Sequence, residues 1–200
     1  MRVLIACEYS GTVRRAFAAR GHDAWSCDLL PADDGSPNHI QGDVLPVLRQ
    51  GWDLMVAHPP CTYLAVSGLH WNKRVPGRAE KTLEALAFVR KLLDAPIDRI
   101  ALENPVSCIS THARKPDQII QPWWFGDDAS KKTCLWLKNL APLVATNRLP
   151  GDDKTRRANQ TPSGQNKLGP SPDRWKLRSK TYPGIAAAMA DQWVKHDLSM

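Results

Sequence analysis

The chain has 200 residues, of which 42% are hydrophobic and 24% are charged, and its formal net charge is +7. This length suits one domain with a buried core, and the composition excludes an intrinsically disordered chain. No apolar run approaches the ~18 residues of a membrane-spanning helix and no secretory signal pattern is present, so we expect a cytoplasmic protein. The five cysteines form no C-x-x-C pair, which argues against disulfides and against a bound metal.

The first half of the sequence alternates predicted strands with predicted helices. Short apolar runs predict strands over 3–7, 22–27, 39–43, 53–57 and 97–102. Apolar residues at helical spacing predict helices over 11–20 and 79–93. The second of these helices has a predicted apolar face of Leu83, Leu86, Ala87 and Leu93. This βαβ rhythm predicts an α/β fold with an open, mostly parallel sheet and helices on both faces.

The second half has a different pattern. Short strands are expected at 119–120 and 133–137, and Pro183 is expected at the first position of a last helix. Residues 147–181 are rich in Pro, Gly, Asn and basic side chains and show little periodicity, so we expect a long irregular segment. We expect residues 1–200 to form one catalytic domain that includes this segment.

The positive charge is concentrated in that irregular segment. Between Arg148 and Lys180 nine basic residues stand against three acidic ones, a surplus of +6. Such a surplus indicates a polyanion partner such as nucleic acid, and the alternative is a solvated loop. Trp175 has basic neighbours on both sides and is therefore the one tryptophan that we expect to contact nucleic acid.

Polar residues follow the carboxyl ends of the predicted strands, where open α/β sheets bind ligands. In strand order they are Glu8 to Gly11, Asp28, Asp43 with Val44, His58 to Thr62, and Glu103 to Pro105. Gly11 would let the backbone approach a ligand, and Asp28 is placed to accept hydrogen bonds from a ribose. The alternative roles are a simple turn and a helix cap, because the first turn contains no G-x-G-x-x-G pattern.

Cys61 and Glu103 are the candidate catalytic residues. Two prolines precede Cys61 and fix its backbone, and a nearby cation or helix N-terminus would lower the pKa of its thiol. Glu103 ends an apolar strand, where burial would raise the pKa of its carboxyl group and let it hold a proton near neutral pH. The alternatives are a structural cysteine and a surface cap. As a pair, they fit covalent addition to a heteroaromatic ring.

The sequence resembles the S-adenosylmethionine-dependent DNA cytosine-5 methyltransferases. Asp53-Leu-Met-Val-Ala-His-Pro-Pro-Cys-Thr resembles the Pro-Cys nucleophile motif of the family, and Leu102-Glu-Asn-Pro resembles its Glu-Asn motif. Short phage-type members are similar at Ala6-Cys-Glu-Tyr-Ser-Gly, Trp25-Ser-Cys-Asp-Leu-Leu-Pro and Lys132-Thr-Cys-Leu-Trp-Leu. The resemblance covers residues 1–140 well and 175–195 loosely, and it implies a Rossmann-like class I methyltransferase fold.

The resemblance also implies a role for each matching residue. Cys61 would attack C6 of a cytosine flipped out of the duplex, and Glu103 would bond its N3 and exocyclic amine. The cofactor S-adenosylmethionine would contact Glu8, Tyr9, Ser10, Gly11, Asp28, Leu29, Asp43, Val44 and Pro60. By the same resemblance DNA would contact Lys131 and Lys132. The charge surplus, rather than the resemblance, adds the expected DNA contacts Arg156, Arg157, Arg174, Trp175, Lys176 and Arg178. No metal is implied.

Four features depart from the family pattern. The first motif lacks Phe-x-Gly-x-Gly, and only Lys131 and Lys132 stand where the family has Gln-x-Arg-x-Arg. Ser179-Lys180 replaces a Gly-Asn pair near the last helix. The target-recognition region is reduced to about 147–178, which offers few side chains to read base pairs. We therefore expect short or lax sequence specificity, set mainly by phosphate contacts.

Three other functions remain open. Amino-methyltransferases carry an aromatic residue directly after Pro-Pro, whereas Tyr63 comes two positions later here. A Cys61-dependent enzyme that transfers another one-carbon unit to a pyrimidine base or nucleotide would share the same site. A non-catalytic nucleic-acid-binding relative is the third alternative, and the presence of both Cys61 and Glu103 argues against it.

Overall fold

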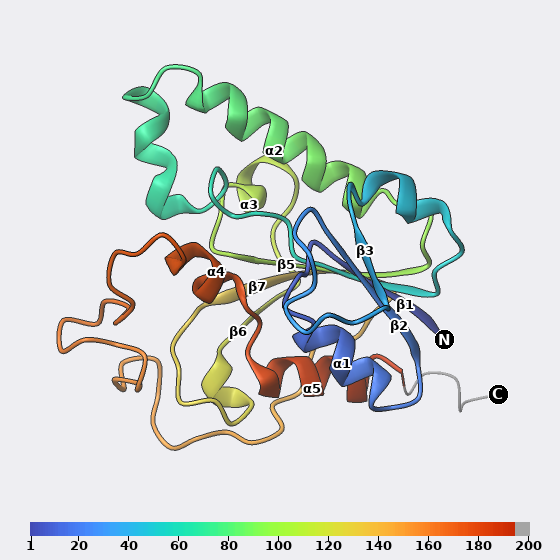
Figure 1. The fold of residues 1–200 in the computed structure, drawn as a ribbon. Helices are drawn as coiled ribbons and strands as arrows, with labels where there is room; N and C mark the ends of the chain where they lie inside the picture. The colour runs from blue at the N-terminus through green and yellow to red at the C-terminus, as the bar shows by residue number, and fades with distance from the viewer. Residues whose placement is uncertain (195–200) are drawn as a thin grey trace.

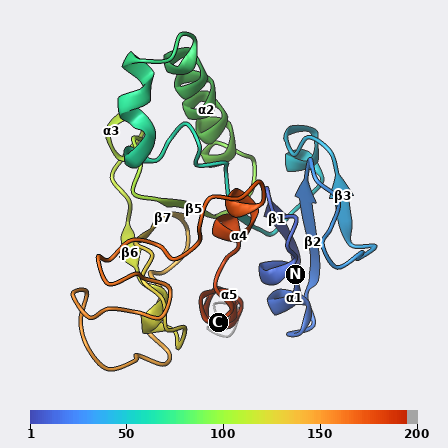
Figure 2. The ribbon, with the colours of Figure 1, turned by 60° about the vertical axis from the view of Figure 1, so that its left-hand side comes forward.

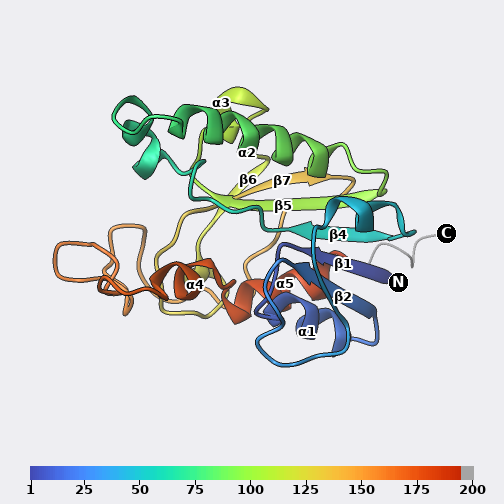
Figure 3. The ribbon, with the colours of Figure 1, turned by 45° about the horizontal axis from the view of Figure 1, so that its top comes forward.

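The computed structural model of the chain describes residues 1–194. One sheet has α2 and α3 on one face and α1 and α5 on the other (Figure 1, Figure 3). The strands are β1 (Arg2–Ala6), β2 (Asp23–Asp28), β3 (His39–Gln41), β4 (Leu54–Ala57), β5 (Arg99–Pro105), β6 (Gln118–Ile120) and β7 (Thr133–Lys138). The α-helices are α1 (Thr12–Ala18), α2 (Arg78–Leu93), α3 (Ile109–His112), α4 (Arg174–Ser179) and α5 (Pro183–Gln192). The 3₁₀ helices are η1 (Leu45–Arg49), η2 (Val66–Lys73) and η3 (Pro122–Trp124).

The strands follow the order β3-β2-β1-β4-β5-β7-β6. β1 to β5 are mutually parallel, whereas β7 runs antiparallel to both β5 and β6. The parallel part has the Rossmann order, in which the first strand is central and its two neighbours begin the two halves. The predicted fold class, a Rossmann-like α/β fold with a mostly parallel sheet and helices on both faces, is confirmed.

Two apolar layers hold the sheet between its helices. One layer packs side chains of β1, β4 and β5 against α2, and its members include Leu4, Met55, Leu86, Val89 and Leu102. The other packs the opposite faces of the same strands against α1 and α5, and includes Val3, Ile5, Phe17, Ala101 and Met189. Strands covered on both faces need nearly continuous apolar sequence, which explains why β1 and β4 were evident from the sequence.

The predicted apolar face of α2 is wrong in its register. Leu83 is 65% exposed, while Leu86, Val89 and Leu92 are buried. Thr82 occupies the inward position instead of Leu83, and its hydroxyl donates a hydrogen bond to the Tyr63 carbonyl over 3.0 Å. This bond fixes the first turn of α2 on the loop that follows β4.

The expectation of an irregular segment over 147–181 also needs correction, because α4 lies within it. In Figure 2, α4 lies close to the end of β1, although the two elements are far apart in the sequence. The Tyr9 hydroxyl donates a 2.7 Å hydrogen bond to the Lys176 carbonyl, which ties α4 to the loop after β1. The segment therefore reaches the carboxyl edge of the parallel strands.

Candidate active site

The loop after β4 is joined to the end of β5 by two hydrogen bonds. β4 and β5 are adjacent and parallel, so His58 to Cys61 and the last residues of β5, Glu103 among them, lie at the same edge of the sheet. His58 Nδ1 lies 2.9 Å from Glu103 Oε2, and Asn104 Nδ2 donates to the Pro59 carbonyl over 2.8 Å. These contacts bring the backbone that carries Cys61 next to the carboxylate of Glu103.

Glu103 is buried and has a lowered pKa. Burial acts to raise the pKa of its carboxyl group, but the ammonium of Lys131 and the His58 ring lower it by more. The prediction that this group holds a proton near neutral pH is therefore wrong, because the sequence did not reveal the nearby cation. Glu103 is a carboxylate that accepts hydrogen bonds.

Cys61 lies at the start of a turn, where its carbonyl accepts hydrogen bonds from the backbone amides of Leu64 and Ala65. The residue is exposed, but desolvation of its thiol raises the pKa. Lys131 and Arg178 oppose this increase, and Glu103 adds to it. The predicted net lowering of the pKa is thus wrong, although a cation lies nearby as expected. At neutral pH the thiol is mainly protonated.

Lys131 lies beside both candidate catalytic residues. It immediately precedes Lys132 and β7, the strand that pairs with β5. Its side chain is partly buried and donates a hydrogen bond to the Arg178 carbonyl over 3.2 Å. With Glu103, Thr133 and Tyr182 it lines a small cavity that has no room for a water molecule. Lys132 is exposed. The sequence predicted a DNA contact for both lysines, and the structure places only Lys131 at the candidate catalytic pair.

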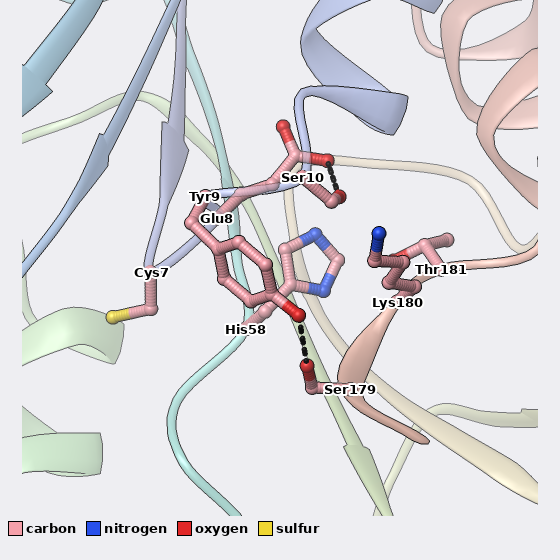
Figure 4. Close-up of a pocket in the computed structure, with 8 residues that line it drawn as sticks. All are labelled: Cys7, Glu8, Tyr9, Ser10, His58, Ser179, Lys180 and Thr181. Atoms are coloured by element: carbon pink, nitrogen blue, oxygen red, sulfur yellow. Dashed lines mark hydrogen bonds between the residues drawn. The ribbon is translucent and has the colours of Figure 1, made fainter. Parts of the chain in front are cut away.

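A second cavity lies where the loop after β1 meets the segment between α4 and α5 (Figure 4). Its lining consists of Cys7, Glu8, Tyr9, Ser10, His58, Ser179, Lys180 and Thr181. Three of the predicted cofactor residues, Glu8, Tyr9 and Ser10, are therefore brought together with Ser179-Lys180, the pair that replaces Gly-Asn. The cavity volume is about 40 Å³, which is room for a few water molecules.

Glu8 accepts hydrogen bonds from the N-terminus of α1 in this conformation. Its carboxylate accepts hydrogen bonds from the backbone amides of Val13 at 2.7 Å and Arg14 at 3.2 Å, and from the Ser10 hydroxyl at 3.3 Å. These amides belong to the first turn of α1, which has no intrahelical acceptor for them. Glu8 thus stabilises the helix N-terminus, and Gly11 before it adopts the left-handed φ of 68° that a glycine tolerates.

The other predicted cofactor residues lie outside this cavity. Asp28 ends β2, and its carboxylate, whose pKa is raised by burial, accepts a hydrogen bond from the Leu30 amide. Asp43 accepts a hydrogen bond from the Leu45 amide over 3.0 Å. Of the remaining three, Leu29 is 74% exposed, Val44 is buried in the core, and Pro60 is exposed. Their assignment to a cofactor stays a prediction.

The structure contradicts the expected contact between Arg157 and DNA. Its side chain is 5% exposed, its guanidinium carbon lies 4.5 Å from the centre of the Trp123 ring, and Asp128 lies 3.9 Å away. A buried arginine cannot meet a DNA phosphate, so this residue packs the segment onto η3. Arg156 and Arg178 are exposed, while Arg174 and Lys176 are half-buried.

Trp175 is accessible, as a nucleic-acid contact requires. The residue is 54% exposed, and its ring centre lies 6.4 Å from that of Tyr9. The ammonium of Lys176 lies 5.7 Å from the Trp175 ring. An exposed aromatic ring beside a cation suits stacking against a base, and this role remains a prediction.

Sequence reasoning missed the segment 62–78 that follows Cys61. No acidic residue occurs between Asp53 and Glu80, whereas the segment has the basic residues Lys73, Arg74 and Arg78. Trp71 is 45% exposed, and the Arg74 guanidinium lies 5.7 Å from its ring centre. The long stretch without acidic residues is the sequence feature from which this segment could have been predicted. The segment forms a basic, aromatic surface next to the candidate nucleophile.

No family model matches the sequence, and no curated protein matches it either. Among solved structures, the chain is similar to a candidate DNA modification methyltransferase encoded within an E. coli prophage, at 13% identity and a TM-score of 0.45. The match covers 68% of this chain and 46% of that protein. It is also similar to the 16S rRNA methylase RmtB, at 17% identity and a TM-score of 0.32, over 68% of this chain and 55% of the methylase. The chain spans about half the length of these proteins.

A membrane-spanning helix and a metal-binding cluster are both absent from residues 1–194. None of the helices in this part of the chain is long and apolar enough to cross a membrane. Within the same residues, no group of three or more His, Cys, Asp or Glu side chains is arranged to hold a metal ion.

Proposed function

We propose that the chain is an S-adenosylmethionine-dependent DNA cytosine-5 methyltransferase that acts through a transient covalent bond between Cys61 and C6 of cytosine. The proposal is carried by the two hydrogen bonds that join the Cys61 loop to the Glu103 strand end. A thiol nucleophile and a buried carboxylate beside one cytosine ring are what covalent activation of that ring requires. The Pro-Pro-Cys and Glu-Asn motifs support the same chemistry.

Glu103 would orient the base. Its Oε2 atom is held by His58, so Oε1 is left to accept a hydrogen bond from the exocyclic amine of a bound cytosine. As a carboxylate, Glu103 bonds to N3 only after a proton is taken up, and binding of the base in this buried site would favour that uptake. Glu103 would therefore distinguish cytosine from bases without an amine at this position.

Cys61 would carry the covalent step. Attack of its thiolate on C6 forms an S–C6 bond and moves an electron pair toward C5 and N3. The Lys131 ammonium, which acts on both Glu103 and Cys61, would stabilise the negative charge on the ring. C5 would then take the methyl group of the cofactor, which would leave as S-adenosylhomocysteine, and loss of the C5 proton to a base with cleavage of S–C6 would restore the aromatic ring and the thiolate.

The chemistry of the second cavity fits the polar end of the cofactor. When bound, S-adenosylmethionine supplies an electrophilic methyl group. Tyr9, Ser10, His58 and Lys180 would hold its amino-acid end, and Asp28 and Asp43 its ribose and adenine. The cavity of about 40 Å³ is far smaller than this molecule, so Ser179 to Thr181 would move outward as the cofactor enters.

The partner that we propose is DNA. Exposed Arg156, Trp175 and Arg178 lie in the segment 147–181, and Trp71 with Arg74 lies in the segment after Cys61. Basic side chains at phosphates would position a duplex, and exposed aromatic rings would stack on bases next to a flipped cytosine.

Trapping on DNA that contains 5-fluorocytosine tests the mechanism. Fluorine at C5 cannot leave as a proton does, so the S–C6 bond persists once the methyl group is in place. We expect a covalent complex of wild-type protein and DNA on a denaturing gel when S-adenosylmethionine is present. The Cys61→Ser variant should give none, whereas Cys108→Ser, which changes a buried thiol elsewhere, should trap as wild type does. A complex that survives in Cys61→Ser would contradict the proposal.

A further inference from the structure

His58 links Glu103, which lines the first cavity, to the second cavity. The residue directly follows β4 and its side chain is 8% exposed. Nδ1 contacts Glu103 Oε2, while the ring itself lines the cavity around Tyr9 and Ser10. In Figure 4 the ring lies between Tyr9 and the backbone of Ser179 to Thr181. One side chain thus touches both the candidate base-binding carboxylate and the candidate cofactor cavity.

The other ring nitrogen of His58 is buried without a partner. Nε2 has no hydrogen-bond partner among the residues that the structure describes. A buried polar atom without a partner is unfavourable, and in a native protein it calls for an explanation such as a bound ligand or water. Because His58 is the one member of the His58–Glu103 pair that lines the cavity, its free nitrogen points to a ligand there.

The chemistry of that ligand follows from the partner of Nδ1. Glu103 is a carboxylate and only accepts hydrogen bonds, so Nδ1 carries the proton. Nε2 then accepts a hydrogen bond when the ring is neutral and donates one when the ring is doubly protonated. Two polar groups of the lining already have partners, since Lys180 pairs with Asp33 and Ser10 bonds to Glu8. An amino-acid group on the ligand, which has both an ammonium donor and a carboxylate acceptor, is complementary to this nitrogen in either state.

We propose that His58 is a positioning residue: its Nδ1–H orients Glu103, and its Nε2 forms a hydrogen bond with the amino-acid end of the bound cofactor. The inference rests on the proposed function and deepens it. Binding of the amino-acid end of the cofactor would fix the imidazole and, through it, the carboxylate that holds the base. Because such coupling is reciprocal, a bound cytosine would strengthen cofactor binding by the same factor.

Two substitutions separate the two nitrogens of His58. The amide nitrogen of Asn in His58→Asn can occupy the place of Nδ1 and keep the bond to Glu103, but nothing replaces Nε2. The amide of Gln in His58→Gln reaches the place of Nε2 and leaves Glu103 without its donor. Circular dichroism and thermal melting of both variants establish that they are folded.

Calorimetric titration with two ligands provides the test. S-adenosylhomocysteine has the α-ammonium group, and 5′-methylthioadenosine lacks the amino-acid end. We expect His58→Asn to bind S-adenosylhomocysteine about tenfold more weakly than wild type, as for one hydrogen bond to a charged group, with unchanged binding of 5′-methylthioadenosine. We expect His58→Gln to bind both ligands within about threefold of wild type and to trap 5-fluorocytosine DNA at least tenfold more slowly.

The outcomes distinguish this inference from the proposed function. Unchanged affinity of His58→Asn for S-adenosylhomocysteine, or an equal loss for both ligands, would overturn the role of Nε2 while the enzyme remained a methyltransferase. Wild-type protein that binds neither ligand would overturn the proposed function and this inference together. The nitrogen NMR signal of Nε2 in wild-type protein gives a readout without any substitution: it should shift with S-adenosylhomocysteine and stay unchanged with 5′-methylthioadenosine, and the absence of that difference would contradict the proposal.

Discussion

Lys131 favours the charged form of both reactive residues. Its ammonium lowers the pKa of the Glu103 carboxyl group and opposes the burial that raises the pKa of the Cys61 thiol. Because the thiolate is the nucleophile, the reactivity of Cys61 at neutral pH depends on this cation. Lys131 thus acts on the candidate nucleophile and the candidate base-binding group at once through its charge, while its ammonium donates its hydrogen bond to the Arg178 carbonyl.

We predict that Lys131→Met raises the pKa of Cys61 further. The alkylation rate of Cys61 by iodoacetamide follows the thiolate fraction, so in wild-type protein the rate increases as the pH rises toward the raised pKa. In the variant the profile should move to higher pH by about one unit, as for the loss of one nearby opposite charge. Mass spectrometry of the Cys61 peptide measures the rate.

The neighbouring Lys132→Met is the matched control for this experiment. Lys132 is exposed and does not act on Cys61, so its removal should leave the pH profile unchanged. Superimposable profiles for Lys131→Met and wild type would show that Lys131 does not activate the thiol.

The N-terminus of α5 fits closely against the turn after η3. A Cβ atom at Gly184 would overlap the carbonyl oxygen of Phe125 and lie 2.8 Å from Asp127 Oδ2. The Gly184 amide also donates a 2.9 Å hydrogen bond to that carboxylate. The start of α5 therefore depends on the absence of a side chain at this position, and α5 covers one face of the sheet.

We predict that Gly184→Ala destabilises the protein by roughly 1–3 kcal/mol, the usual cost of an added methyl group in a close-packed site. Urea denaturation followed by circular dichroism measures the change in the free energy of unfolding. Gly169→Ala is the control, because a Cβ there meets nothing within 4 Å. Equal stability of Gly184→Ala and wild type would mean that the backbone at Phe125 can move away from the added methyl group without a cost in free energy.

Arg156 and Arg157 are adjacent in sequence but have different surroundings. Arg156 is exposed, while Arg157 packs on Trp123 near Asp128. We predict that Arg156→Gln reduces the slope of log affinity for duplex DNA against log salt by about one, equally for unrelated sequences. Arg157→Gln should leave that slope unchanged and lower the stability instead. Fluorescence anisotropy and urea denaturation measure the two effects, and identical slopes for Arg156→Gln and wild type would exclude a phosphate contact.

Local sequence patterns were sufficient for the strands and the common edge of the site. β1 and β4 are continuous apolar runs, and the polar groups after β4 and β5 meet because neighbouring parallel strands end together. The properties that the sequence did not reveal depend on distant residues. The ionised state of Glu103 is set by Lys131 from the start of β7, and the burial of Arg157 is set by Trp123. In both pairs the two residues are far apart in the sequence, and no periodic pattern indicates that they meet.

At the scale of the whole molecule, one sheet edge collects the candidate nucleophile, the candidate base-binding carboxylate and a candidate cofactor residue. The loops after β1 and β4 supply Tyr9 and Cys61, the end of β5 supplies Glu103, and the Tyr9 hydroxyl ties α4 to this edge through its bond to the Lys176 carbonyl. The segments 62–78 and 147–181 supply exposed cations and aromatic rings. This arrangement is what the proposed methyl transfer to a base would require, with the segment 147–181 as a shortened region for DNA contacts.

The most direct test of the central claim identifies the methylated nucleoside. Purified protein is incubated with genomic DNA and S-adenosylmethionine that has a deuterated methyl group, and the DNA is digested to nucleosides for mass spectrometry. We predict deuterated 5-methyl-2′-deoxycytidine with wild-type protein and none with Cys61→Ser. Label in N4-methyl-2′-deoxycytidine or N6-methyl-2′-deoxyadenosine, or in no nucleoside at all, would contradict the account.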